Sequence, residues 1–147
     1  MKITILAIGK SRTDLHEKAI TEYQKRLTRY VKLELIFLPA SNKEQESLAI
    51  KSHIDRFDYT ILLDERGSTW STPELAASID KLRNNSVKSV AFIIGGAHGV
   101  THDLRELVDH IWSLSDLVLP HELARLVLIE QIYRSYNIIN GGKYHHS

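Results

Sequence analysis

Three segments of the sequence place glycine, proline or histidine directly after an apolar run. They are 62–67 (Leu-Leu-Asp-Glu-Arg-Gly), 93–99 (Ile-Ile-Gly-Gly-Ala-His-Gly) and 112–121 (Trp-Ser-Leu-Ser-Asp-Leu-Val-Leu-Pro-His). Each alone would be an ordinary turn, because glycine after a strand is common. Three in succession indicate more, since glycine lets a ligand approach the main chain and α/β proteins bind ligands at the carboxyl ends of strands. The sequence therefore predicts a small-molecule site lined largely by backbone.

The familiar phosphate and metal motifs do not account for these segments. The glycines of 95–99 do not form G-x-G-x-x-G, and Gly9-Lys10-Ser11 lacks the first glycine of a P-loop. His98 and His102 straddle a predicted loop with no H-E-x-x-H pattern, so we predict no metal site. The chain has no cysteine, which excludes disulfides and a thiolate nucleophile.

The composition is typical of a soluble globular protein. Of 147 residues, 43% are hydrophobic and 25% charged, and no apolar run approaches the roughly 20 residues that cross a bilayer. We therefore expect a cytoplasmic protein without a membrane partner. The net charge is only +1, but basic residues gather at Lys25, Arg26, Arg29 and Lys32, with Lys10 and Arg12 nearby in sequence. They form either a solvated helix face or a phosphate-contacting patch, and charge alone does not decide between the two.

Apolar periodicity predicts strands that alternate with helices along the whole chain. This alternation predicts an α/β fold, a mostly parallel sheet with helices on both faces, in a single domain spanning 1–147. Asn42 could cap one helix, and Ser71 and Glu74 have capping-box spacing with Pro73 in the first turn. The predicted strands are 2–8, 32–38, 59–63, 89–94 and 112–119, and the predicted helices are 15–30, 42–54, 71–82, 101–110 and 121–137.

The final third of the chain carries a specific resemblance. Ile94-Gly95-Gly96 with Gly99, then 114–121, then Arg125, Glu130, Tyr133-Arg134 and the terminal Tyr144-His145 resemble the ribosomal large-subunit methyltransferase H family. The match extends over the full length, because the opening Met1-Lys2-Ile3, Glu22-Tyr23 with Arg26, and Leu63-Asp64 with Gly67 also fit.

The resemblance implies a SPOUT methyltransferase with a C-terminal trefoil knot, against the general rule that chains do not thread. Members of the family act as homodimers and use S-adenosylmethionine to methylate N3 of a pseudouridine in helix 69 of 23S rRNA. By position, the cofactor contacts would fall on Leu63, Gly95, Gly96, Leu114, Ser115, Asp116, Leu117, Val118 and Leu119.

The methyl transfer implied by the resemblance is an in-line displacement, which requires alignment of donor and acceptor and loss of the N3 proton. It needs no covalent nucleophile, in keeping with a chain that lacks cysteine. The candidates for the catalytic, RNA-facing side are His121, Arg134, Tyr144 and His145. His121 or the tail would assist proton removal, and Arg134 would hold a phosphate or a base carbonyl.

Two alternatives remain open at the level of sequence. The chain could be a SPOUT methyltransferase that acts on tRNA or on another rRNA site. It could instead be a non-catalytic RNA-binding or ribosome-binding domain with the same fold. Calorimetry with S-adenosylmethionine would separate the second alternative from an enzyme.

Overall fold

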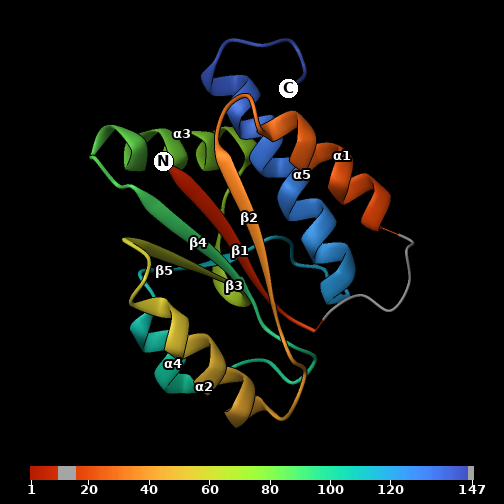
Figure 1. Cartoon of the computed structure of the whole chain (residues 1–147), viewed down its shortest axis with the longest axis vertical. Helices are drawn as coiled ribbons and strands as arrows, with labels where there is room; N and C mark the ends of the chain where they lie inside the picture. Colours follow the sequence, from red (N-terminus) through yellow and green to blue (C-terminus); the bar gives the residue numbers. More distant parts are fainter. Residues whose placement is uncertain (10–15, 146–147) are drawn as a thin grey trace.

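A five-stranded sheet forms the centre of the molecule (Figure 1), in a computed structural model that describes residues 1–9 and 16–145. The spatial order of the strands is β2-β1-β4-β3-β5, and every neighbouring pair is parallel. All carboxyl ends therefore meet at one edge of the sheet, as the alternating sequence pattern predicts. The strands are β1 (Lys2–Ile8), β2 (Lys32–Leu38), β3 (Tyr59–Thr69), β4 (Ser89–Ile94) and β5 (His110–Ser113).

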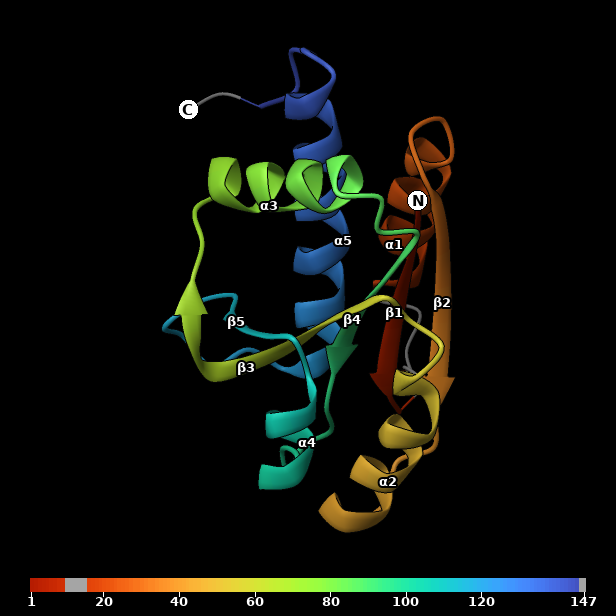
Figure 2. The same ribbon diagram turned by 90° about the vertical axis from the view of Figure 1, so that its left-hand side faces the viewer.

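Helices cover both faces of this sheet, as predicted (Figure 2). One face carries α1 (Glu17–Leu27), α3 (Thr72–Asn84) and α5 (His121–Ile139), and α5 packs against both of the others. The opposite face carries α2 (Lys43–Ile54) and α4 (His102–Leu107). The structure thus confirms an α/β architecture with a parallel sheet between two helical layers.

Alternate residues of each central strand feed two separate hydrophobic cores. In β4, Phe92 packs into the core beneath α1, α3 and α5, whereas Ile93 packs into the core beneath α2 and α4, and both are fully buried. Ile5 and Leu6 of β1 divide between the two cores in the same way. A strand buried on both faces needs an uninterrupted apolar sequence. This need explains the near-continuous apolar runs of β1 and β4.

The predicted helix starts on α2 and α3 are confirmed in atomic detail. The Asn42 Oδ1 atom accepts the Gln45 N–H at 2.8 Å. Ser71 Oγ accepts the Glu74 N–H at 3.2 Å, and Glu74 Oε1 accepts the Ser71 N–H at the same distance, which completes the capping box. Each cap satisfies backbone donors that a helix leaves unpaired at its first turn.

The last predicted strand, 112–119, is wrong beyond Ser113, where β5 ends. The Ser113 hydroxyl donates to the Ser115 carbonyl at 2.9 Å, and the Ser115 hydroxyl accepts the Leu117 N–H at 2.9 Å. Such local side-chain bonds offer the backbone an alternative to a sheet ladder. Residues 114–120 therefore form a loop that leads into α5.

Other boundaries also differ from the prediction. β3 continues to Thr69 through a register shift between Leu63 and Ser68, so polar residues 64–68 belong to a bent strand and not to a turn after it. The helix predicted over 101–110 ends at Leu107, because His110 already pairs with Ile61 as the first residue of β5. Lys10, Arg12 and the predicted helix start at residue 15 lie outside the described residues.

The buried side chain of Tyr136, on α5, allows a test of packing in the core between α5 and the sheet. Its side chain is 2% exposed, its hydroxyl has no hydrogen-bond partner among the described residues, and burial raises its pKa to about 12. The folded state then keeps a proton that the unfolded state loses above about pH 10, so stability falls between about pH 10 and 12. We expect Tyr136→Phe to match or exceed the wild type in urea unfolding at pH 7.5 and to lose less stability at pH 11. A loss above about 1 kcal/mol at pH 7.5 would contradict an unpaired hydroxyl.

Candidate functional site

A cavity of about 530 Å³ opens at the carboxyl ends of β3, β4 and β5. Its volume falls within the roughly 300–1,000 Å³ typical of small-molecule sites. The three segments singled out in the sequence supply most of its wall: 63–66, 94–100 and 113–121, with Arg105 and Ala124 completing it. The predicted convergence of these segments is confirmed. The register explains it, because Leu63 pairs with Ile94 on one side and with Trp112 on the other.

The glycine loop 95–99 forms one wall of the cavity. At Gly95 and Gly96 a side chain would collide with neighbouring atoms. A Cβ atom on Gly96 would lie 2.5 Å from Oε1 of Glu46, and one on Gly95 would lie 2.9 Å from Cγ1 of Val100. Gly99 adopts φ +75°, and its N–H donates to the Gly96 carbonyl at 3.1 Å to close the loop. The Glu46 side chain, from α2, therefore buttresses the glycine wall from behind.

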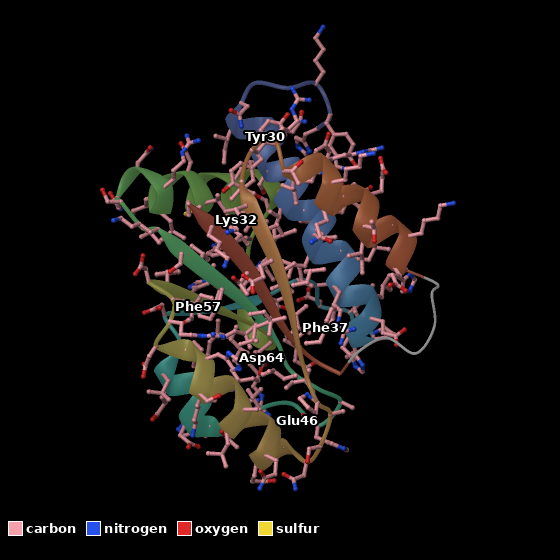
Figure 3. The ribbon with its side chains drawn as sticks, viewed as in Figure 1. Tyr30, Lys32, Phe37, Glu46, Phe57 and Asp64 are labelled. Carbon is pink, nitrogen blue, oxygen red and sulfur yellow. The ribbon has the colours of Figure 1, made fainter. Side chains whose placement is uncertain are left out.

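Glu46 is held firmly in that position. The residue is 2% exposed, and its Oε2 atom accepts the Ser41 N–H at 2.8 Å. Figure 3 labels Glu46 and Asp64 in the lower half of the molecule, toward α2 and α4. Glu46 could not be identified from the sequence, because the helical period of 42–54 is weak.

The loop 114–120 forms the opposite wall and exposes unusual apolar surface. Leu117 and Val118 are 73% and 82% exposed, although both line the cavity. Seven of the eight other residues predicted at this site also line it: Leu63, Gly95, Gly96, Leu114, Ser115, Leu119 and His121. Asp116 is exposed and does not line the cavity.

The remaining predicted residues, Arg134, Tyr144 and His145, gather elsewhere around Glu130 of α5. Arg134 Nη2 and Nε lie 2.6 and 2.9 Å from Glu130 Oε1, which also accepts the Tyr144 hydroxyl at 3.1 Å. Arg134 Nη1 is 3.3 Å from Nδ1 of His145. We call Glu130, Arg134, Tyr144 and His145 the tail cluster.

Aromatic rings and basic residues of α1 extend the tail cluster. The Tyr144 hydroxyl is 3.3 Å from that of Tyr23, and the Tyr144 ring meets Tyr133 edge-on at 4.8 Å. The Arg26 guanidinium lies 5.9 Å from the Tyr133 ring centroid, which brings the basic residues of α1 beside the tail cluster. Cations interleaved with aromatic rings are typical of surfaces that bind single-stranded nucleic acid.

Electrostatics fix the charge states of the tail cluster. The hydrogen bonds that Arg134 donates to Glu130 raise the pKa of its guanidinium above the usual value. Burial and the hydrogen bonds to Tyr23 and Glu130 raise the pKa of the Tyr144 phenol. At neutral pH the cluster therefore holds a neutral phenol beside a cationic guanidinium.

The cavity and the tail cluster are separate sites within one chain. His121 lies at the cavity and Arg134 is 13 residues further along the same helix. At 1.5 Å per residue, the two positions are about 20 Å apart along α5. The structure thus brings together eight of the predicted cofactor contacts and His121, and it keeps the other three catalytic candidates apart from them.

The cavity also contains two charged residues to which the sequence pattern assigns no role, Asp64 and Arg105. Arg105 Nε donates to Asp64 Oδ2 at 3.0 Å, and the two side chains are 16% and 11% exposed. Asp64 directly follows an apolar run, which was an available signal, whereas Arg105 is one charged residue among several on a short helix.

The described part of the chain contains neither a metal-binding group nor a membrane-spanning helix. No group of three or more His, Asp or Glu side chains within it could hold a metal ion. His102 instead lies 2.9 Å from Glu106 in the next turn. None of the helices in this part of the chain has the length and apolar character needed to span a membrane.

Comparison with known proteins assigns the family. Residues 1–145 match the family described as predicted SPOUT methyltransferase. Proteins named ribosomal RNA large subunit methyltransferase H from Acetivibrio thermocellus and Gloeobacter violaceus are each 37% identical to this chain, over 99% of both sequences.

Solved structures confirm the fold. A probable methylase from Haemophilus influenzae matches 99% of this chain and 70% of its own with a TM-score of 0.60 at 15% identity. A tRNA (m1G37) methyltransferase from Aquifex aeolicus matches 91% of this chain and 70% of its own with a TM-score of 0.55 at 16% identity. With full-length relatives above 30% identity and a cavity where the shared segments converge, the chain belongs to the ribosomal RNA large subunit methyltransferase H (RlmH) family of SPOUT methyltransferases.

Proposed function

We propose that this protein methylates N3 of a pseudouridine in helix 69 of 23S rRNA, with S-adenosylmethionine as the methyl donor. Full-length membership of the RlmH family is the observation that carries the proposal. The cavity agrees with it, because the segments that the family resemblance assigns to the cofactor are those that converge there.

The residues of the cavity fit S-adenosylmethionine. The main chain of 95–99 and 113–119 offers donors and acceptors for an adenine edge, and Leu63, Leu117 and Leu119 offer apolar faces for its ring. The ion pair of Arg105 with Asp64 adds a charged group to this otherwise largely apolar and backbone-lined cavity. When bound, this cofactor supplies a methyl group activated by a positively charged sulfur.

The protein's own part in the reaction is alignment and proton removal. The loop 114–120 and the glycine loop would hold the donor between them and shield it from water. His121, the first residue of α5, lines the cavity and would take the N3 proton of the base. Arg134 and Tyr144 would bind the RNA, with Tyr144 kept neutral by its raised pKa.

The distance between the two sites supports a homodimer. The tail cluster of one chain lies about 20 Å along α5 from its own cavity, so it does not complete that cavity by itself. A twofold arrangement would bring the tail cluster of one protomer to the cavity of its partner. The exposed Leu117 and Val118 at the cavity rim provide apolar surface for such contact.

We further propose that residues 1–147 form one SPOUT domain with a C-terminal trefoil knot. The five strands share one sheet, and α5 packs against α1 from the other end of the chain. The connection 114–120 leads from the edge strand β5 to α5 and lines the cavity together with the ends of β3 and β4. The ribosomal substrate favours a cytoplasmic location.

The glycine wall yields a prediction about cofactor affinity. In Gly96→Ala the new methyl group would lie 2.5 Å from Glu46 Oε1, and Glu46 is buried and bonded to Ser41. The loop would shift into the cavity, so we expect S-adenosylmethionine to bind roughly tenfold more weakly in calorimetry. The double variant Gly96→Ala/Glu46→Ala removes the obstructing atoms and should regain part of the lost affinity. Equal affinity of Gly96→Ala and wild type for S-adenosylmethionine would contradict the close contact between Glu46 and Gly96.

The function is tested by mass mapping of helix 69. In a strain that lacks the gene, we expect the N3-methyl group on pseudouridine to disappear and the purified protein with S-adenosylmethionine to restore it on isolated ribosomes. An unchanged helix 69 together with loss of a methyl group from tRNA or another rRNA site would favour the first alternative. Failure of the protein to bind S-adenosylmethionine would favour a non-catalytic RNA-binding domain.

A further inference from the structure

A charged pair lies within the wall of the cavity. Asp64 follows the apolar half of β3, and Arg105 lies on α4. Their side chains meet at 3.0 Å and are only 11% and 16% exposed. Ion pairs on open surfaces contribute little, whereas a shielded pair at a ligand site is placed to act on the ligand.

The two partners differ in how many of their hydrogen-bonding positions are used. Each Asp64 oxygen accepts one hydrogen bond: Oδ1 from the Arg66 N–H at 2.9 Å and Oδ2 from Arg105 Nε. The guanidinium, by contrast, makes only this one hydrogen bond within the described part of the chain. Its Nη1 and Nη2 groups together carry four further donors.

These free donors are directed toward the glycine loop. The Nη2 atom of Arg105 is 3.9 Å from the position that a Cβ atom on Gly99 would occupy, and both residues line the cavity. Asp64 fixes the guanidinium through Nε, which leaves the pair of terminal N–H groups at the cavity. A fixed guanidinium with two parallel donors matches a carboxylate, which it binds in a bidentate manner.

We propose that Arg105 binds the carboxylate of the methionyl group of S-adenosylmethionine and that Asp64 positions Arg105 for this contact. The inference rests on the proposed function, since it assigns one end of the cofactor to one end of the same cavity. A carboxylate suits the guanidinium better than an ammonium group, because Arg105 uses one of its five donors, whereas each oxygen of Asp64 already accepts a hydrogen bond.

Ligands that differ by one carboxylate test the assignment without relying on activity. Calorimetry would compare S-adenosylmethionine with decarboxylated S-adenosylmethionine in the wild type and in Arg105→Gln. We expect Arg105→Gln to bind S-adenosylmethionine roughly ten- to a hundredfold more weakly and to bind the decarboxylated form within about twofold of wild type. Asp64→Asn should weaken S-adenosylmethionine binding less, because it only loosens Arg105.

Arg83→Gln is the matched control, because Arg83 forms an exposed ion pair with Asp80 on α3 and lies away from the cavity. It should bind both ligands as the wild type does. Equal affinity of wild-type protein for the two ligands would overturn the inference even if Arg105→Gln failed to fold. So would a loss of RNA binding in Arg105→Gln with unchanged S-adenosylmethionine binding, which would assign Arg105 to an RNA phosphate. Wild-type protein that binds neither ligand would overturn the proposed function itself.

Discussion

Gly67→Ala is expected to lower the free energy of unfolding by about 2–4 kcal/mol. A Cβ atom at Gly67 would lie 2.4 Å from the carbonyl oxygen of Ile111 and 2.7 Å from the amide nitrogen of Trp112. Both atoms belong to the backbone of β5, so no side-chain rotation relieves the overlap. As the edge strand beside β3, β5 would be displaced, and the loop 114–120 that follows it would move away from the cavity.

Urea unfolding at pH 7.5 measures the effect, and Gly141→Ala provides the comparison. Gly141 has φ +72° with no atom within 4 Å of an added Cβ, so its substitution introduces backbone strain without a collision. Such strain costs about 1–2 kcal/mol. A stability loss for Gly67→Ala no larger than that for Gly141→Ala would contradict the close approach of β3 and β5. Cofactor affinity should fall in Gly67→Ala and not in Gly141→Ala.

Mixed dimers should regain methylation that neither parent variant has. Arg134→Gln removes the guanidinium that Glu130 fixes in the tail cluster, and we expect roughly a hundredfold loss of methylation with S-adenosylmethionine affinity within about twofold of wild type. Leu119→Trp fills the cavity from its loop wall and should abolish cofactor binding. If each site combines the cavity of one protomer with the tail cluster of its partner, a mixed dimer contains one intact site.

Co-refolding the two variants in equal amounts should therefore restore about a quarter of wild-type activity, since half of the dimers are mixed and each holds one intact site of two. Tagged purification of the mixed species should raise this value to about a half. Activity that equals the average of the two parents would show that cavity and tail cluster act within one chain. A monomer in sedimentation would contradict the dimer directly.

The convergence of the cavity walls could be predicted from sequence because parallel strands share one carboxyl edge. Leu63, Ile94 and Trp112 lie in one row across the sheet, and each apolar run had been recognised separately. The ends of β3 and β5 could not be predicted in the same way. Residues 64–68 are polar yet stay in a strand through pairing with β5, and 114–119 are apolar yet leave it through the hydrogen bonds of Ser113 and Ser115.

The charged residues that shape the cavity could not be identified from sequence for a different reason. Glu46 lies on α2 and Arg105 on α4, on the face of the sheet opposite α5. Only tertiary packing brings them to the glycine loop. The tail cluster was grouped with His121 by family resemblance, which carries no information on distance. In the fold, thirteen residues of rigid helix separate His121 from Arg134.

The order in which the cavity walls occur along the chain has a consequence for synthesis. Glu46, which supports the glycine loop, comes first in the sequence. Leu63 and Gly95 follow, and the loop wall at 114–121 comes last, toward the C-terminus. A growing polypeptide exposes these parts from the N-terminus onward. A nascent chain therefore has no complete cavity until nearly all of it has emerged from the ribosome that makes it. Prematurely terminated products would neither take up the methyl donor nor compete for it with finished enzyme.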